Sequence, residues 1–202
     1  MISINYIENK LSNQIKTPNV AEKAGVLIPI IQNTQGELHL LFQIRSAQLK
    51  WQPNDICFPG GRMEEQDKTP IDTALRETQE ELDVDAKTIK VCGQLPPFIS
   101  PLGLKIYPII GHLTCLEFNL NQDEVADVFT VPIEWFMANP PTKSTMQTAF
   151  KPADDFPFHL VKNRSRNWQK HAQHEVHFYH YQQYTIWGLT AKIVQSFITM
   201  IR

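Results

Sequence analysis

Four acidic side chains crowd residues 77–83 in a pattern suited to binding a divalent cation. On a helix, Glu77 and Glu81 project side by side, and Glu80 borders them about a quarter-turn away. Like charges at this spacing repel, and acids near a helix C-terminus oppose its dipole. Carboxylates without Cys or His suit hard Mg²⁺ or Mn²⁺, which usually act on phosphate oxygens. The pattern is compatible with a metal site, but alone it favours a solvated face with Arg76 as partial counterion.

An amphipathic helix has to present these carboxylates. Thr69 supplies a capping oxygen, Pro70 fits the first helical position and Asp72 lies in the first turn, so the helix should open near Thr69. One stripe at helical spacing should face the core. It comprises Ile71, Ala74, Leu75, Thr78 and Leu82.

The sequence FPGG at 58–61 comes shortly before this helix. Gly60 and Gly61 allow the backbone to approach a ligand closely. A glycine loop leading to a helix is a common way to present backbone groups to phosphate. The glycine pair therefore strengthens the case for a phosphate-directed metal site.

Together these residues resemble the Nudix box, a family pattern of a glycine, an acid, an Arg-Glu pair and a Glu-Glu pair. The matching residues are Gly61, Asp67, Arg76, Glu77, Glu80 and Glu81. Asp67 replaces the usual Glu with one extra residue before Arg76, Thr78 stands where an aliphatic is usual, and Asp83 where a glycine is usual. The resemblance implies an α/β fold: an α/β/α sandwich with a mixed β-sheet and the box as a loop-helix-loop.

The segment before the box is similar to a motif of the coenzyme A pyrophosphatases within this family. The matching residues are Leu41, Arg45, Ser46, Leu49, Lys50, Ile56 and 58–61. Gln43 stands where a Thr is usual, Lys50 where an Arg is usual and Asn54 where a Gly is usual. The resemblance implies substrate contacts by Arg45, Ser46, Lys50 and Gly61, although Arg45 and Lys50 are also compatible with plain surface charges.

The implied reaction is hydrolysis of the diphosphate bond of coenzyme A or its derivatives, giving 3′,5′-ADP and 4′-phosphopantetheine. The expected cofactor is Mg²⁺ or Mn²⁺ held by Glu77 and Glu81, assisted by Glu80 and the Gly60 carbonyl. Either Glu80 or Glu124 would act as the base, and Arg76 would orient the glutamates. Glu124 is equally compatible with a solvated acid in a loop. The alternatives are cleavage of ADP-ribose, of a dinucleotide such as NADH or of a nucleoside triphosphate, and a non-catalytic nucleotide-binding module.

The composition is that of one globular domain over residues 1–202, with 42% hydrophobic and 20% charged residues. A net charge of −2 gives no basic footprint for a nucleic-acid polymer. The arm at 1–24 has no signal-peptide pattern, and no later apolar stretch is long enough to cross a membrane. The widely spaced Cys57, Cys92 and Cys115 look like reduced core residues. We expect a cytoplasmic protein acting on a small nucleotide, and the arm is compatible with a homodimer.

Strand-like runs surround the box. Residues 26–31 and 38–44 should form a hairpin around Gly36, and residues 89–100 and 104–113 alternate strand runs with Pro and Gly breaks. Glu124 follows Asp123 in a loop before another apolar run.

The last third of the chain is harder to assign. Residues 139–170 contain four prolines and little periodicity, which predicts a long irregular loop, either a surface loop or a substrate-facing lid. The next segment, rich in aromatics, favours a strand over a metal-binding helix, and one or two of its His or Tyr side chains should touch substrate. It carries His171, His174, His177 and His180. Residues 187–201 have the spacing of a helix that covers a sheet.

Overall fold

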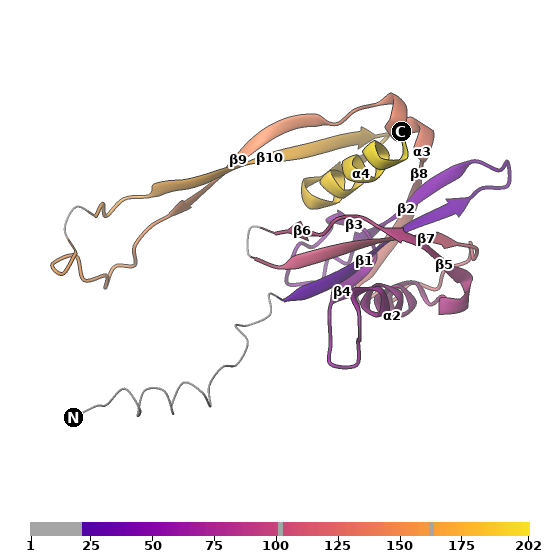
Figure 1. Ribbon diagram of the computed structural model, residues 1–202, viewed down its shortest axis with the longest axis horizontal. Helices are drawn as coiled ribbons and strands as arrows, with labels where there is room; N and C mark the ends of the chain where they lie inside the picture. The colour runs from indigo at the N-terminus through magenta and orange to yellow at the C-terminus, as the bar shows by residue number, and fades with distance from the viewer. Residues whose placement is uncertain (1–21, 101–102, 162–163) are drawn as a thin grey trace, which may run out of the picture. The chain divides into compact units, whose positions relative to one another are not determined.

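The computed structural model describes residues 22–100, 103–161 and 164–202 (Figure 1). The predictions for the arm at 1–24 and its part in a homodimer fall almost entirely outside these residues; its last two, Lys23 and Ala24, belong to the first strand. The chain divides into two compact units, one ending at Thr130 and the other spanning Val131–Arg202. The expected single domain over residues 1–202 stays a prediction.

The first unit is built on a mixed sheet around strand β1, Lys23–Gln32. β1 runs parallel to β7, Lys105–Leu113, over most of its length. On its other side β1 changes partner: its first residues pair with β4, Gly60–Arg62, and its last with β2, Leu38–Arg45, both antiparallel. The predicted hairpin of β1 and β2 is confirmed.

Short strands complete this sheet. β3, Ile56–Cys57, and β8, Val125–Pro132, pair with β2; β5, Ile89–Gln94, and β6, Phe98–Ile99, pair with β7. A 3₁₀ turn, η1, Ala86–Thr88, leads into β5. The mixed sheet and the expected α/β fold are confirmed.

Helix α2, Pro70–Leu82, packs on β1 and β4, as Figure 1 shows. Of its predicted core stripe, Ala74, Thr78 and Leu82 are buried, and Ile71 and Leu75 are partly buried against the same core. The core between helix and sheet also contains Leu27, Leu41, Ile109 and Leu113, each 0% exposed. The helix is therefore anchored to the sheet by its apolar stripe.

The second unit contains helix α3, Ile133–Ala138, a three-stranded antiparallel sheet and helix α4, Gly188–Ile201. The strands are β9, Thr142–Phe150, β10, Gln169–Tyr181, and β11, Tyr184–Trp187, in the order β11-β10-β9. α4 packs on β10 and β11, burying Ile193, Val194 and Phe197. The predicted strand bearing the four histidines and the predicted final helix are both confirmed.

Two predictions need correction. The segment 139–170 is not irregular throughout, because β9 occupies Thr142–Phe150. The side chains of β9 are mostly exposed, so the sequence shows no apolar alternation that would predict a strand. The strand is held by backbone hydrogen bonds to β10. Nor are all three cysteines core residues: Cys57 and Cys115 are partly buried and unpaired, but Cys92 is exposed on the edge strand β5.

Among the helices that the structure describes, none combines the length and the apolar character that crossing a bilayer requires.

Candidate active site

Helix α2 begins where the sequence predicts. The Thr69 hydroxyl accepts from the Asp72 N–H, and Asp72 in return accepts from the Thr69 N–H at 2.8 Å, which completes a capping box. At the other end, Asp83 adopts the left-handed conformation at φ 54°, which explains why a glycine is usual there. The two caps fix where the helix begins and ends, and thereby the direction in which each glutamate side chain projects.

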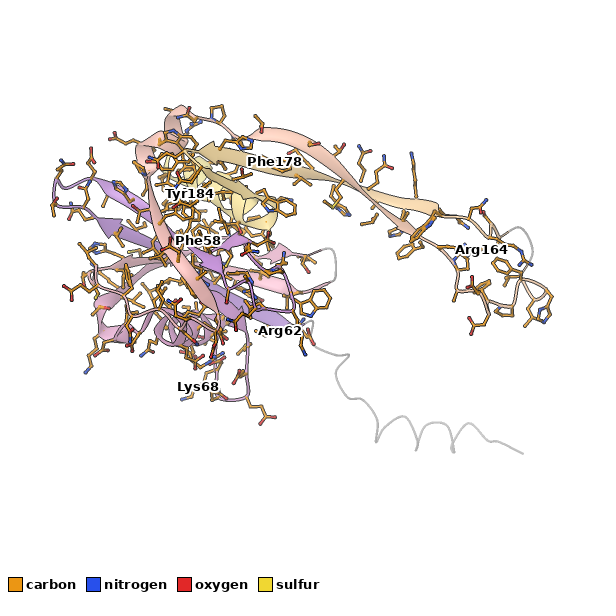
Figure 2. The ribbon with its side chains drawn as sticks, turned by 180° about the vertical axis from the view of Figure 1, so that it is seen from behind. Phe58, Arg62, Lys68, Arg164, Phe178 and Tyr184 are labelled. Atoms are coloured by element: carbon orange, nitrogen blue, oxygen red, sulfur yellow. The ribbon has the colours of Figure 1, made fainter. Side chains whose placement is uncertain are left out.

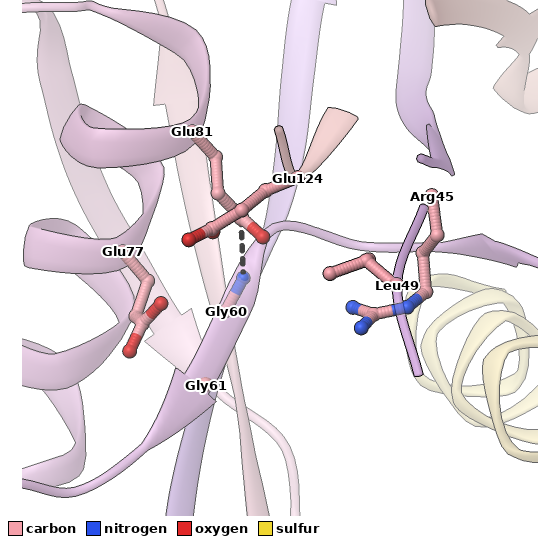
Figure 3. A pocket seen from close by; sticks show the side chains of 7 residues that line it. All are labelled: Arg45, Leu49, Gly60, Gly61, Glu77, Glu81 and Glu124. Atoms are coloured by element: carbon pink, nitrogen blue, oxygen red, sulfur yellow. Dashed lines mark hydrogen bonds between the residues drawn. The ribbon is translucent and has the colours of Figure 1, made fainter. Parts of the chain in front are cut away.

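A cavity of about 270 Å³ lies between α2, the glycine turn and the loops after β2 and before β8. Figure 3 shows Glu77 and Glu81 on the helix side of the Gly60–Gly61 strand, with Arg45 and Leu49 across from them. Glu124 also lines the cavity. Three carboxylates and one guanidinium thus face a single space, and they come from three segments of the chain that lie more than thirty residues apart in the sequence.

Glu81 is the most buried of these acids, at 3% exposure. One carboxylate oxygen accepts from the Gln43 amide at 2.9 Å and the other from the Gly60 N–H at 3.0 Å. Burial raises the pKa of Glu81 to about 8 despite these two bonds, because neither donor carries a charge. The site therefore holds an acid whose charge would be stabilised by a cation.

Arg76 organises a second group of acids. It donates to Asp67 at 3.0 and 3.1 Å, to Glu80 at 2.9 Å, and is paired with Glu77 at 2.9 Å. Burial raises the pKa of Glu77, and Arg76 opposes this shift. Arg76 thus forms ion pairs with Glu77 and Glu80 and is not among the residues that line the cavity, and its orienting role stays a prediction.

The two glycines are required by close approach. A Cβ on Gly61 would stand 2.3 Å from a Glu77 carboxylate oxygen, and Gly60 has a φ of +148° with the β1 backbone 2.4 Å from such a Cβ. Phe58, from the same turn, is buried and stacks on Phe42 of β2 at 4.8 Å between ring centroids. The aromatic pair anchors the turn, and the glycines leave room for the carboxylate.

Backbone hydrogen bonds place Glu124 beside the helix. The Asn121 N–H donates to the Glu81 carbonyl at 3.0 Å, and the Glu124 N–H donates to the Asn121 carbonyl at 2.9 Å. The Glu124 carbonyl in turn accepts from the Ser46 N–H at 2.8 Å. The loop before β8 is thereby tied both to the C-terminal end of α2 and to the end of β2.

The donor set fits a hard divalent cation. Glu77, Glu81 and Glu124 offer oxygen ligands in one cavity, and the two donors to Glu81 are neutral. Within the described ranges, no three His, Cys, Asp or Glu side chains already share a point where an ion would bind. Some of these carboxylates would therefore have to reorient toward a common point on binding a cation.

Other predicted site residues lie elsewhere. Glu80 is 55% exposed and bound to Arg76, Lys50 is exposed, and Ser46 is buried; none of the three lines the cavity. The four histidines of β10 belong to the second unit, where His177 is buried and contacts Glu175 at 2.7 Å. Their expected contact with substrate stays a prediction.

The contact between Gln43 and Glu81 is not predicted by the sequence patterns above, in which Gln43 is only a departure from a motif. Gln43 is 0% exposed and donates to Glu81. A signal was present, because an amide at the end of the apolar run LHLLF needs a buried partner.

The family model of the NUDIX domain matches residues 21–173. The chain therefore belongs to the Nudix hydrolase family. It is 31% identical over 199 residues to the uncharacterized Nudix hydrolase NudL of Pectobacterium atrosepticum, covering 98% of this chain and 92% of that protein.

Two further similarities concern a curated relative and a solved structure. The peroxisomal coenzyme A diphosphatase NUDT7 of Mus musculus is 36% identical over 118 residues, which cover 58% of this chain and 50% of that protein. The crystal structure of a MutT/nudix family protein from Enterococcus faecalis aligns with a TM-score of 0.52 at 14% identity, over 99% of this chain and 70% of that one. The latter supports the fold alone.

Proposed function

We propose that this Nudix hydrolase cleaves the diphosphate bond of coenzyme A or its derivatives with Mg²⁺ or Mn²⁺, giving 3′,5′-ADP and 4′-phosphopantetheine. The observation that carries the proposal is the cavity with three carboxylates and Arg45 around it. A cation on the glutamate side and a guanidinium opposite would together neutralise a diphosphate. At about 270 Å³, the cavity suits a diphosphate better than a whole nucleotide.

Two observations favour coenzyme A among diphosphates. The motif before the box resembles that of coenzyme A pyrophosphatases, and its Arg45 lines the cavity. The partial similarity to a coenzyme A diphosphatase from Mus musculus points the same way. Lys50, exposed on the same segment, would contact the parts of the substrate that lie outside the cavity, whereas Ser46 is buried beside Arg45.

In the proposed mechanism, Glu77, Glu81 and the Gly60 carbonyl would hold a divalent cation, which would neutralise the phosphates and make a water molecule more acidic, while Glu80 stays bound to Arg76. Arg45 would bind the phosphate oxygens opposite the glutamates, and Gly61 would let them approach the backbone. Arg76 would hold Glu77 in orientation.

Hydrolysis also needs a group that takes the proton of the attacking water. Glu124 lines the cavity, whereas Glu80 is engaged by Arg76 at 2.9 Å outside it. We therefore assign the role of base to Glu124. The water oxygen bonds to one phosphorus, the bridging P–O bond breaks, and the leaving phosphate keeps its electron pair.

Mass spectrometry of the products tests this proposal. The protein is incubated with Mg²⁺ or Mn²⁺ and coenzyme A, ADP-ribose, NADH or a nucleoside triphosphate. We expect 3′,5′-ADP and 4′-phosphopantetheine to form fastest. Faster cleavage of another compound would replace the substrate assignment, and no cleavage of any would favour a nucleotide-binding module.

A further inference from the structure

Gln43 of β2 forms a hydrogen bond with Glu81, one of the acids that line the cavity. Its side chain is fully buried, and its Nε2 donates to Glu81 Oε1 at 2.9 Å. The Gly60 N–H donates to the other oxygen of the same carboxylate at 3.0 Å. Each oxygen of Glu81 thus has one fixed donor, which restrains the rotation of the carboxylate about its long axis.

The donors to Glu81 differ in kind from the donor to Glu77. Glu77 is paired with a guanidinium, whereas Glu81 is held by an amide and a backbone N–H. A neutral donor fixes the position of a carboxylate without supplying the charge that a cation would have to displace. The pairing therefore leaves Glu81 oriented and still available to a cation.

The geometry has a local cost that packing does not explain. The Oε1 atom of Gln43 is buried and finds no hydrogen-bond partner within the described part of the chain. A buried unpaired oxygen is unfavourable, and an apolar side chain of similar volume would avoid it. Local rules broken in this way are expected where a residue serves a site.

We propose that Gln43 is a positioning residue, which orients the Glu81 carboxylate for a divalent cation. This inference rests on the proposed metal-dependent function. Groups that orient metal ligands typically change metal affinity or activity by about 10- to 100-fold when removed.

Mn²⁺ binding measured by electron paramagnetic resonance, without substrate, tests the inference in the full chain. Gln43→Met keeps the volume and removes the donor. We expect its Kd for Mn²⁺ to rise about 10-fold or more. Its melting temperature without metal should change by less than about 4 °C, because one donor and one unpaired oxygen are lost together. Turnover should fall at low Mn²⁺ and recover largely at saturating Mn²⁺.

Gln147→Met is the matched control, since Gln147 lies exposed on β9. It should bind Mn²⁺ as the wild type does. If Gln43→Met is too unstable to purify, Gln43→Asn, one methylene shorter, should show the same weakened binding. An unchanged Kd in the folded Gln43 variant would overturn the positioning role.

The proposed function fails differently. If wild-type protein binds Mn²⁺ but cleaves no diphosphate, the reaction is wrong and the Gln43 inference can still be measured. If wild-type protein binds no Mn²⁺, both are wrong.

Discussion

Arg76 and Asp67 form a paired contact in which Nε donates to one carboxylate oxygen at 3.1 Å and Nη2 to the other at 3.0 Å. Asp67 is buried and also accepts from the Thr73 hydroxyl at 3.0 Å. The contact ties the loop before α2 to the helix. Although Asp is shorter than the usual Glu, it still reaches Arg76, which is also paired with Glu77.

The same ion pair makes the free energy of unfolding depend on pH in the acidic range. The hydrogen bonds from Arg76 lower the pKa of Asp67 from 3.8 to about 2. Because the pKa of Asp67 is lower in the folded protein than in the unfolded chain, the ionised carboxylate stabilises the fold at pH values above the unfolded pKa. This contribution disappears as the pH falls from about 4 to about 2. In urea unfolding at pH 7, the free energy of unfolding of Asp67→Asn should be lower than that of the wild type by up to about 2 kcal/mol. Screening by solvent reduces this difference.

At pH 2 the Asp67 variant and the wild type should have nearly equal stability. Asp155→Asn, at an exposed site, is the control and should follow the wild type at every pH. A stability difference for Asp67→Asn that stays constant from pH 7 to pH 2 would contradict the ion-pair explanation.

Glu81→Gln should remove metal-dependent hydrolysis. The substitution keeps the shape and removes the charge, so turnover should fall by at least about 100-fold while circular dichroism is unchanged. Glu80→Gln, one residue away and half-exposed, should lose less than about 10-fold. Equal activity of wild type and Glu81→Gln would refute the assigned site.

Glu124→Gln tests the assignment of the base. A positioned base typically contributes about 100- to 10,000-fold, so kcat should fall by this factor. If Glu80 rather than Glu124 is the base, the larger loss of kcat will appear in Glu80→Gln. Rapid quench assays at saturating metal and substrate distinguish the two.

Gly61→Ala should damage the site without unfolding the protein. The new Cβ would stand 2.3 Å from a Glu77 oxygen, so the carboxylate must move. We expect kcat/KM to fall at least about 10-fold with little change in melting temperature. Gly93→Ala is the control, because the nearest atom to its Cβ would be 4.0 Å away. Comparable losses in both variants would mean that contact with Glu77 is not the cause.

Local sequence patterns predicted the elements of the site well. Thr69, Pro70 and Asp72 marked the start of α2, and the apolar stripe marked its buried face, because capping and helical periodicity are properties of neighbouring residues. The β1–β2 hairpin and the final helix were predicted for the same reason. β9 was not, since an exposed strand is defined by its bonds to β10.

By itself the sequence determined the helix, the glycine turn and the spacing of Glu77 and Glu81. Only the tertiary structure decided which acids share the cavity. It brings Glu124 and Arg45 to Glu81 and leaves Glu80 with Arg76. It also places Gln43 behind Glu81, 38 residues away in the chain. Such pairings depend on strand order and long-range packing, which residue spacing alone does not specify.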